Sequence, residues 1–217
     1  MIYIEGKQEG DAWHRCRWGT VTGSQFKVVV KAGAKGNPLP QKLNSAGVMT
    51  YAKKLAEQRC RRGFVPPPED AFVSPAMQRG TELEPRARAA YEMETGNDVD
   101  QWRFIYRDET HEIGTSPDGT VGDDGGYEVK CPDLGTLLSW HYDYGPVCPP
   151  LHIPQVQGCM WVTNRKWWDF QAWRPPHDDT FPEWVYRVER DEEWMAAFDE
   201  HIVAFNDRVN EIVNWRT

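Results

Sequence analysis

The sequence predicts an α/β (α+β) fold in which a central mixed β-sheet is flanked by helices. Hydrophobic spacing switches between the helical period and the strand period along the chain, in the order helix, strands, helix, strands, helix. A chain of 217 residues can bury a sizeable core and suits one domain or two small ones. The linker-like run VPPPED at 65–70 is too short to mark a boundary, so we expect one domain over 1–217.

The N-terminal third is expected to hold helices separated by turns and a loop. A short helix over 11–17 begins at Asp11, and Ser24 is expected to cap the start of the next helical segment. Gly, Pro and Lys are frequent in 31–44, which predicts a mobile basic loop. A helix over 46–62 follows, because its apolar residues return at helical spacing.

The middle of the chain changes from a helix to strands. Apolar residues share one stripe over 74–95, which predicts a helix with Pro85 inside it and Gly96 as its stop signal. Asp-Asp-Gly-Gly at 123–126 is expected to form the turn between the last two strands of this part. The strands are expected at 99–107, 113–116 and 127–131.

The C-terminal part completes the predicted sheet and covers it. A helix is expected over 152–162, followed by strands at 167–173 and 184–188. A long amphipathic helix is expected over 191–215. Its apolar residues at helical spacing are Trp194, Phe198, Ile202, Phe205 and Val209.

The charge is distributed unevenly along the chain. The formal net charge is -8, which at first argues against a nucleic-acid partner. Residues 1–63, however, hold 12 Lys and Arg against 4 Asp and Glu, whereas residues 64–217 hold 13 against 29. This asymmetry predicts a basic N-terminal third on an acidic body, and the basic face is suited to phosphate groups.

No membrane anchor or disulfide framework is expected. No run approaches the roughly 18 apolar residues of a membrane span, and the first residues lack an apolar signal-peptide core, so we expect a cytoplasmic protein. The number of cysteines, five, is odd and no C-x-x-C occurs, which favours reduced thiols. A zinc site is a weaker alternative, because its spacings match no usual motif. Its ligands would be Cys131, His141, Cys148 and His152.

Three charged residues form a candidate catalytic group. A turn at 123–126 would bring Asp118 beside Glu128, and Glu128 and Lys130 lie two apart on one face of a strand. Two neighbouring carboxylates repel each other in a cleft of low dielectric, and a divalent cation such as Mg²⁺ or Mn²⁺ removes that repulsion. A nearby ammonium can orient water and stabilise negative charge, as phosphodiester hydrolysis requires. The spacing alone equally allows an acidic turn followed by an exposed strand.

The chain resembles a known family. The pattern around Asp118 resembles the PD-(D/E)xK nucleases, and most of the chain is similar to the lambda exonuclease family, which includes the YqaJ-type phage recombinases. Several blocks lie in the same order and at similar separations. These blocks are DAWHRCRWGTVTGS, RGTELEPRARAAYEMETG, IYRDE, TSPDG, EVKCP, PQVQGCMWVT and VERDEEWMAAFDE.

The resemblance assigns roles within the catalytic group. Lys130 corresponds to the catalytic lysine. Gln157 in QVQ corresponds to the glutamine near the attacking water, although Gln155 could be confused with it. The metal ligands implied by the resemblance are Asp118, Glu128, the carbonyl of Val129 and, directly or through water, Glu84.

The resemblance also implies a DNA-end site. Arg17, Ser24 and Ser116 correspond to a pocket for the 5′-phosphate, and an arginine fork and hydroxyls suit that anion. Trp13 and Trp18 flank the pocket and are candidates for base stacking. Met77 stands where the family has an apolar wedge that parts the terminal base pair.

The resemblance implies a function. The implied function is that of a processive 5′→3′ exonuclease that depends on Mg²⁺, and Mn²⁺ is expected to substitute for Mg²⁺. Such an enzyme digests one strand of linear double-stranded DNA to mononucleotides, leaving a 3′ overhang. It implies a homotrimer, a single-strand annealing protein as partner and a phage or prophage origin in a bacterial host cell.

Other functions stay open from the sequence. A PD-(D/E)xK endonuclease would share the core but would not need the 5′-phosphate pocket. An iron–sulfur nuclease is disfavoured because the cysteines lack a four-Cys spacing. A non-catalytic DNA-end-binding protein is disfavoured because every candidate catalytic residue is present.

Overall fold

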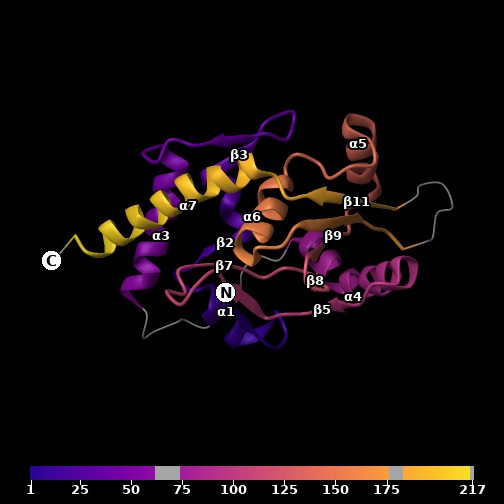
Figure 1. Cartoon of the computed structure of the whole chain (residues 1–217), viewed down its shortest axis with the longest axis horizontal. Coiled ribbons are helices and arrows are strands. Elements are labelled where there is room, and N and C mark those ends of the chain that lie inside the picture. Colours follow the sequence, from indigo (N-terminus) through magenta and orange to yellow (C-terminus); the bar gives the residue numbers. More distant parts are fainter. Residues whose placement is uncertain (62–73, 176–182, 216–217) are drawn as a thin grey trace.

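The computed structural model describes residues 1–61, 74–175 and 183–215, and the side chains of 75–77 lie outside this description. The strands form two main sheets, and the helices pack around them (Figure 1). The predicted fold class, a mixed sheet flanked by helices, is confirmed.

The larger sheet carries the candidate catalytic residues. Its five strands lie in the order β11-β10-β9-β8-β5. β9 and β10 are parallel, and the other neighbours are antiparallel, so the sheet is mixed. The strands are β5 (Val99–Asp100), β8 (Gly119–Val121), β9 (Gly125–Lys130), β10 (Trp167–Ala172) and β11 (Trp184–Glu189).

A second sheet has four strands in the order β1-β6-β7-β2, and a separate ribbon pairs β3 with β4. Within the second sheet β2 and β7 run parallel, with Val21 opposite Ile113. The strands are β1 (Ile2–Ile4), β2 (Val21–Thr22), β6 (Phe104–Tyr106), β7 (Ile113–Thr115), β3 (Val30–Ala32) and β4 (Pro38–Pro40).

The helices predicted over 11–17, 46–62, 74–95, 152–162 and 191–215 are all present, and α5 (Leu134–Tyr144) is an additional one. No helix within 1–61, 74–175 or 183–215 is long and apolar enough to cross a membrane. The helical elements are α1 (Gly10–Arg17), η1 (Gly23–Gln25), α2 (Phe26–Val29), α3 (Ala46–Cys60), α4 (Pro75–Thr95), α5 (Leu134–Tyr144), α6 (Ile153–Thr163) and α7 (Glu192–Val213).

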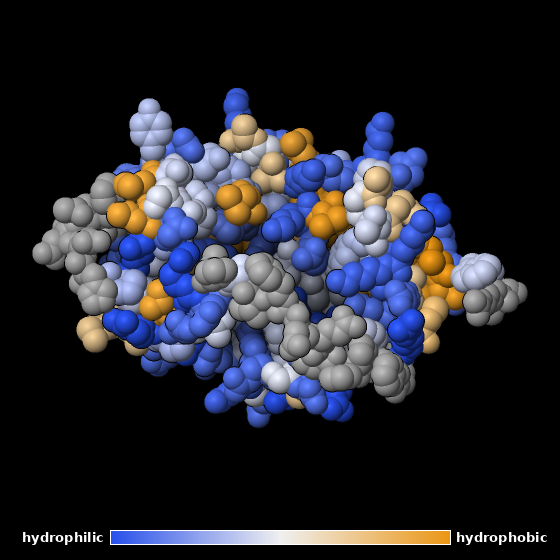
Figure 2. Space-filling view, turned by 180° about the vertical axis from the view of Figure 1, so that it is seen from behind, coloured by the Kyte–Doolittle hydropathy of each residue, from blue (hydrophilic) through white to orange (hydrophobic). Residues whose placement is uncertain are grey.

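The main core forms where α6 packs between α7 and the larger sheet. Nearly all of α6 is buried, because apolar residues surround it on every side. Gly158 lets the ring of Phe26 approach so closely that a Cβ there would lie 2.1 Å from it. The five apolar residues predicted for α7 are all buried, and each such side chain contributes roughly 1.5–3 kcal/mol of transfer free energy. On the face shown in Figure 2, hydrophobic side chains are scattered among hydrophilic ones.

Three local predictions were wrong. The segment 31–44 is not a loop throughout, because β3 and β4 form a hairpin whose Gly36 carbonyl accepts a 2.9 Å bond from the Trp194 indole on α7. The segment 99–107 is not one strand, since β5 and β6 join different sheets. Ser24 does not cap a helix but lies inside η1, where Thr22 takes the cap position.

The hairpin was also predicted with the wrong partner strand. β9 pairs with the short strand β8, which was not predicted, whereas β7 belongs to the second sheet. Pro117 lies between β7 and β8, so the chain can leave one sheet and enter the other. Gly125 and Gly126, predicted as turn residues, lie in β9 instead. The rings of Trp167 and Trp168 pack directly against these two glycines.

Gly126→Ala should destabilise the fold. A Cβ at this position would lie 2.3 Å from ring atoms of the buried Trp168, and overpacking of this kind costs about 1–3 kcal/mol. Thermal unfolding followed by circular dichroism should show a lower Tm. Gly47→Ala in α3 is the matched control, because its Cβ meets open space and should leave Tm unchanged or raise it. Equal Tm values for the two variants would contradict the packing described here.

Candidate active site

The β8–β9 hairpin brings the predicted catalytic residues together. Asp118 directly precedes β8, and its Oδ2 accepts a 2.8 Å hydrogen bond from the Val129 amide on β9. The guanidinium of Arg165 holds the turn of the hairpin by donating to the carbonyls of Gly122 (2.6 Å) and Gly125 (2.7 Å). The carboxylate of Asp118 is therefore fixed against the strand that carries Glu128.

Glu128 lies at the centre of the group and is fully buried. Its Oε1 accepts hydrogen bonds from the ammonium of Lys130 and from the side-chain amide of Gln155, the latter at 2.6 Å. Its Oε2 is buried without a hydrogen-bond partner among the described residues. A buried carboxylate oxygen without a partner is costly, so this atom is suited to a ligand that supplies positive charge.

Glu84 completes the acidic group from α4. This helix packs on β9 through Ala87 and Tyr91, and the Tyr91 ring lies 4.6 Å from the ring of Tyr127. The carboxylate of Glu84 forms a 3.8 Å ion pair with Arg88 one turn later. Three acidic side chains and one lysine thus approach each other from β9, from α4 and from the segment just before β8.

Burial and mutual repulsion shift the pKa values of these groups. Burial, and then the charge of Asp118, raise the pKa of Glu128 to about 8 and that of Glu84 to about 7. Burial also raises the pKa of Asp118, although Lys130 and the Val129 amide oppose the rise. For Lys130, burial lowers the pKa, but the carboxylates of Glu128 and Asp118 outweigh it, so its pKa is raised and it stays charged.

The residues fit a divalent cation. Oxygen atoms of Asp118, Glu128 and Glu84 are the hard ligands that Mg²⁺ and Mn²⁺ prefer. A cation would relieve the repulsion that, after burial, raises the pKa values of Glu128 and Glu84. Val129, whose carbonyl was predicted as a ligand, lines a cavity together with Glu84 and Asp118. Within the described part of the chain, no three His, Cys, Asp or Glu side chains already surround one point, and this holds for the alternative zinc set too. A bound cation would therefore also need water and backbone ligands.

A cavity of about 590 Å³ opens over this group. Five of the predicted site residues line it, from α1, α4, β9 and the residue just before β8. Its size and its charged lining suit a polar ligand such as a nucleotide. The lining residues are Trp13, Arg79, Gly80, Thr81, Glu84, Asp118, Val129, Lys130, Cys131, Pro132, Asp133, Thr136 and Trp140.

The residues predicted for the 5′-phosphate also lie together. The Arg17 guanidinium donates to the Ser24 hydroxyl at 3.3 Å and lies 4.7 Å from the centre of the Trp13 ring. The Trp13 indole in turn donates to the Ser116 hydroxyl at 2.8 Å. Trp13 also lines the cavity of Asp118, so the two predicted sites are joined. Burial lowers the pKa of Arg17.

The prediction for Gln157 needs correction. Its amide donates to the Glu189 carbonyl at 2.8 Å and accepts from the Asp191 amide at 3.1 Å, so it joins α6 to the start of α7. Gln155 reaches Glu128 instead. Residues two apart on an α-helix are separated by about 200° around its axis, so the two side chains point in opposite directions.

Trp18 is not among the described residues that line the cavity. The Trp18 indole donates to the Gln58 carbonyl on α3 at 2.9 Å, which ties α1 to α3. Met77 belongs to α4, and its side chain lies outside the described residues.

Sequence reasoning missed several cavity residues. Arg79 lines the cavity and bonds to the Cys131 carbonyl at 3.2 Å, and Thr136 and Trp140 approach from α5, which was not predicted. Arg88 could have been found from its spacing of four residues after Glu84 on a predicted helix.

Comparison with known proteins identifies relatives. A family model described as the YqaJ-like viral recombinase domain matches residues 12–166. An alkaline exonuclease from Laribacter hongkongensis, LHK-Exo, is similar in structure with a TM-score of 0.78 and 31% identity. The match covers 95% of this chain and 96% of LHK-Exo, and the LHK-Exo complex with dAMP gives the same values. These matches confirm the predicted fold class of PD-(D/E)xK type.

Two further relatives are more distant or shorter. A phage related exonuclease from Haemophilus somnus 129PT shares the fold, with a TM-score of 0.58 at 16% identity over 91% of this chain and 96% of that one. The uncharacterized protein ExoD of Escherichia coli (strain K12) is 35% identical over 60 residues, which are 28% of this chain and 68% of ExoD.

The raised carboxyl pKa values predict how stability depends on pH. A carboxyl whose pKa is higher in the folded chain stabilises the fold below its unfolded pKa, and this contribution is lost as the pH rises through the folded pKa. For Glu84 and Glu128, with folded values of about 7 and about 8, the Tm of the metal-free protein should therefore fall between about pH 5 and pH 8. Each kcal/mol corresponds to about 2–4 °C in a chain of this size.

Thermal unfolding in EDTA and in Mg²⁺ checks this pH dependence. Mg²⁺ should raise Tm more at pH 9 than at pH 6, because the carboxylates must be ionised to bind it. Glu128→Gln should flatten the metal-free profile, whereas Glu57→Gln, an exposed change on α3, should not. A metal-free Tm that stays level or rises over this range would contradict the assignment.

Proposed function

The chain belongs to the YqaJ-like viral recombinase family, and on that premise we propose that it is a Mg²⁺-dependent 5′→3′ exonuclease that digests linear double-stranded DNA. A nuclease role follows from the family and from the likeness to LHK-Exo. The observation that carries the proposal is the buried group of Asp118, Glu128 and Lys130 at a cavity that also contains Trp13, next to Arg17.

The side chains of the site divide the work of phosphodiester hydrolysis. When bound by Asp118 and Glu128, Mg²⁺ supplies Lewis-acid polarisation of the phosphate and a lower pKa for its water. The ammonium of Lys130 bonds to Glu128 and lines the cavity, so it would stabilise negative charge that develops on the phosphate. Gln155 shares Oε1 of Glu128 with Lys130 and keeps that carboxylate in place.

The neighbouring pocket accounts for a start at the 5′ end. Arg17 is partly buried between the Ser24 hydroxyl and the Trp13 ring, and neither group neutralises its charge. A terminal phosphate would supply the negative charge that balances Arg17. It would accept hydrogen bonds from Arg17 and from the hydroxyls of Ser24 and Ser116. Because Trp13 links Ser116 to the cavity, a phosphate held there would place the next phosphodiester bond near Asp118.

The remaining parts of the proposal follow the family. We propose that the enzyme is processive, releases mononucleotides and leaves a 3′ overhang for a single-strand annealing protein. A homotrimer would keep the DNA enclosed, since a single 25.1 kDa chain does not easily surround a duplex. The basic N-terminal third would hold the duplex through its phosphates. We propose that the protein works in the cytoplasm of a bacterial host, from a phage or prophage gene.

A linear duplex phosphorylated on one 5′ end tests the proposed activity. With Mg²⁺, the phosphorylated strand should disappear first and mononucleotides should accumulate, while Lys130→Ala should lose activity by about 10²-fold or more, because it stabilises the transition state. A covalently closed circle should stay intact. Cutting of the circle would support an endonuclease instead, and binding without cleavage would support a DNA-end-binding protein.

The two glutamines of α6 should respond differently to substitution. Gln155→Ala should lower kcat about 10–100-fold, because Glu128 loses a supporting hydrogen bond. Gln157→Ala should cost about 1–3 kcal/mol of stability, because the Asp191 amide loses its partner, and should keep the activity of the folded fraction. Nuclease assays and thermal unfolding on both variants separate these outcomes. A reversed pattern would restore Gln157 as the active-site glutamine.

A further inference from the structure

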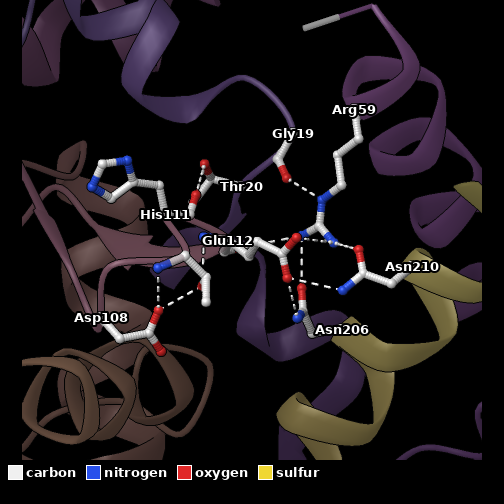
Figure 3. A network of polar contacts seen from close by, with 9 residues as sticks. Gly19, Thr20, Arg59, Asp108, His111, Glu112, Asn206 and Asn210 are labelled. Carbon is white, nitrogen blue, oxygen red and sulfur yellow. Dashed lines mark hydrogen bonds and ion pairs between the residues drawn. The ribbon is translucent and has the colours of Figure 1, made fainter.

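Arg59, at the end of α3, is a buried arginine with several partners (Figure 3). Its side chain is 2% exposed. Its Nε donates to the Gly19 carbonyl at 2.7 Å, and its terminal nitrogens donate to Asn210 Oδ1 at 2.7 Å and Asn206 Oδ1 at 2.6 Å on α7. Its planar fork therefore joins α3, α7 and the segment that follows α1.

Glu112 closes this network from the other side. It forms an ion pair with Arg59 at 3.6 Å, and its Oε2 accepts from the side-chain amides of Asn206 and Asn210, both at 2.9 Å. Asn206 and Asn210 are one helical turn apart, so each amide bonds to Arg59 with its oxygen and to Glu112 with its nitrogen. Such a closed group of four side chains keeps one geometry, because each member restricts the others.

The network holds the segment that carries one half of the phosphate pocket. Gly19 has a φ of +73°, and its amide donates to the Gln58 side chain at 3.0 Å while its carbonyl accepts from Arg59. Thr20 bonds to the His111 carbonyl at 3.1 Å, and Figure 3 shows both beside the network. This segment lies between Arg17 and Ser24 in the chain.

The same network holds the strand that carries the other half. Glu112 directly precedes β7, which ends one residue before Ser116, and its carbonyl accepts from the Val21 amide of β2 at 2.8 Å. β2 and β7 are parallel with Thr22 opposite Gly114, and Ser24 and Ser116 each lie two residues beyond this pair. The network thus lies at the start of two parallel strands whose far ends carry the phosphate pocket.

We infer that Arg59 and Glu112 are positioning residues that set the distance between the two halves of the phosphate pocket and so determine the preference for a 5′-phosphate. One half consists of Arg17 and Ser24, and the other half is Ser116. This inference rests on the proposed function. Ser116 lies four residue steps along the strand from Glu112, about 13 Å, so Glu112 does not touch the phosphate. Misplacing a binding group by about 1 Å can cost about 10²-fold in rate, so a small slip of β2 against β7 is enough to matter.

Glu112→Gln and Arg59→Lys test this inference. Each keeps the size of the side chain but weakens the ion pair or removes the fork. The ratio of kcat/KM for 5′-phosphorylated over 5′-hydroxyl duplex should fall about tenfold in either variant, mainly through KM, because the phosphate is bound less well. Anisotropy titration with both duplexes in EDTA should show the same loss of preference without catalysis. In a Ser116→Ala background, Glu112→Gln should reduce the preference little further, since both act on one pocket.

Val209→Ala is the matched control. Val209 is buried on α7 beside Asn210, so the variant should lose stability without changing the phosphate preference. If both network variants keep the wild-type preference, or if Val209→Ala loses it equally, Arg59 and Glu112 serve stability alone and the inference is overturned. A wild-type enzyme that digests DNA with no preference for a 5′-phosphate would instead overturn the proposed pocket and the inference with it. If one network variant does not fold, the other decides the outcome.

Discussion

The bond from the Val129 amide to Asp118 holds the two parts of the catalytic group together. Asp118 lies in an irregular segment between two sheets, and without this bond its carboxylate would not be fixed beside β9. Glu128 and Lys130 alternate with Val129 along the strand, so the same bond sets their distance from Asp118. The buried Arg165 supports this arrangement by holding the turn of the hairpin. A buried carboxylate cluster follows from this geometry, and the proposed cation would relieve the repulsion within that cluster.

The second sheet has a different task. Its parallel strands β2 and β7 end beside each other, and the residues just beyond those ends carry the hydroxyls of the proposed phosphate pocket. Trp13 joins that pocket to the catalytic cavity through its bond to Ser116. One sheet thus carries the proposed cleavage group and the other carries the proposed end-binding group. The contact between them would set how far from the 5′ end the chain is cut.

The sequence predicted local features well and long-range ones poorly. The burial of Phe198 and Val209 on α7 follows from their period alone, and Glu128 and Lys130 follow from the two-residue period of a strand. By contrast, β8 has three residues and depends on pairing with β9, which no local pattern reveals. Gln155 and Gln157 differ by helical phase, and the phase can be assigned only when the packed face of α6 is known.

The same limit applies to the networks behind the site. Arg59 meets partners 40 to 151 residues away in sequence, and nothing near it in the chain distinguishes it from a surface arginine. The hairpin of β3 and β4 was likewise hidden, because its prolines and glycines are typical of loops. Its position depends on the Trp194 indole, which lies 158 residues from Gly36. Contacts of this kind require the folded structure.

The central claim is that Asp118 and Glu128 together bind the cation on which hydrolysis depends. The most direct measurement is an anomalous difference map from a crystal of the protein soaked in Mn²⁺. The structure predicts a peak between the carboxylates of Asp118 and Glu128, within coordination distance of Oε2 of Glu128, which has no partner among the described residues. A map with no peak there, from a protein that digests DNA under the same conditions, would contradict the account.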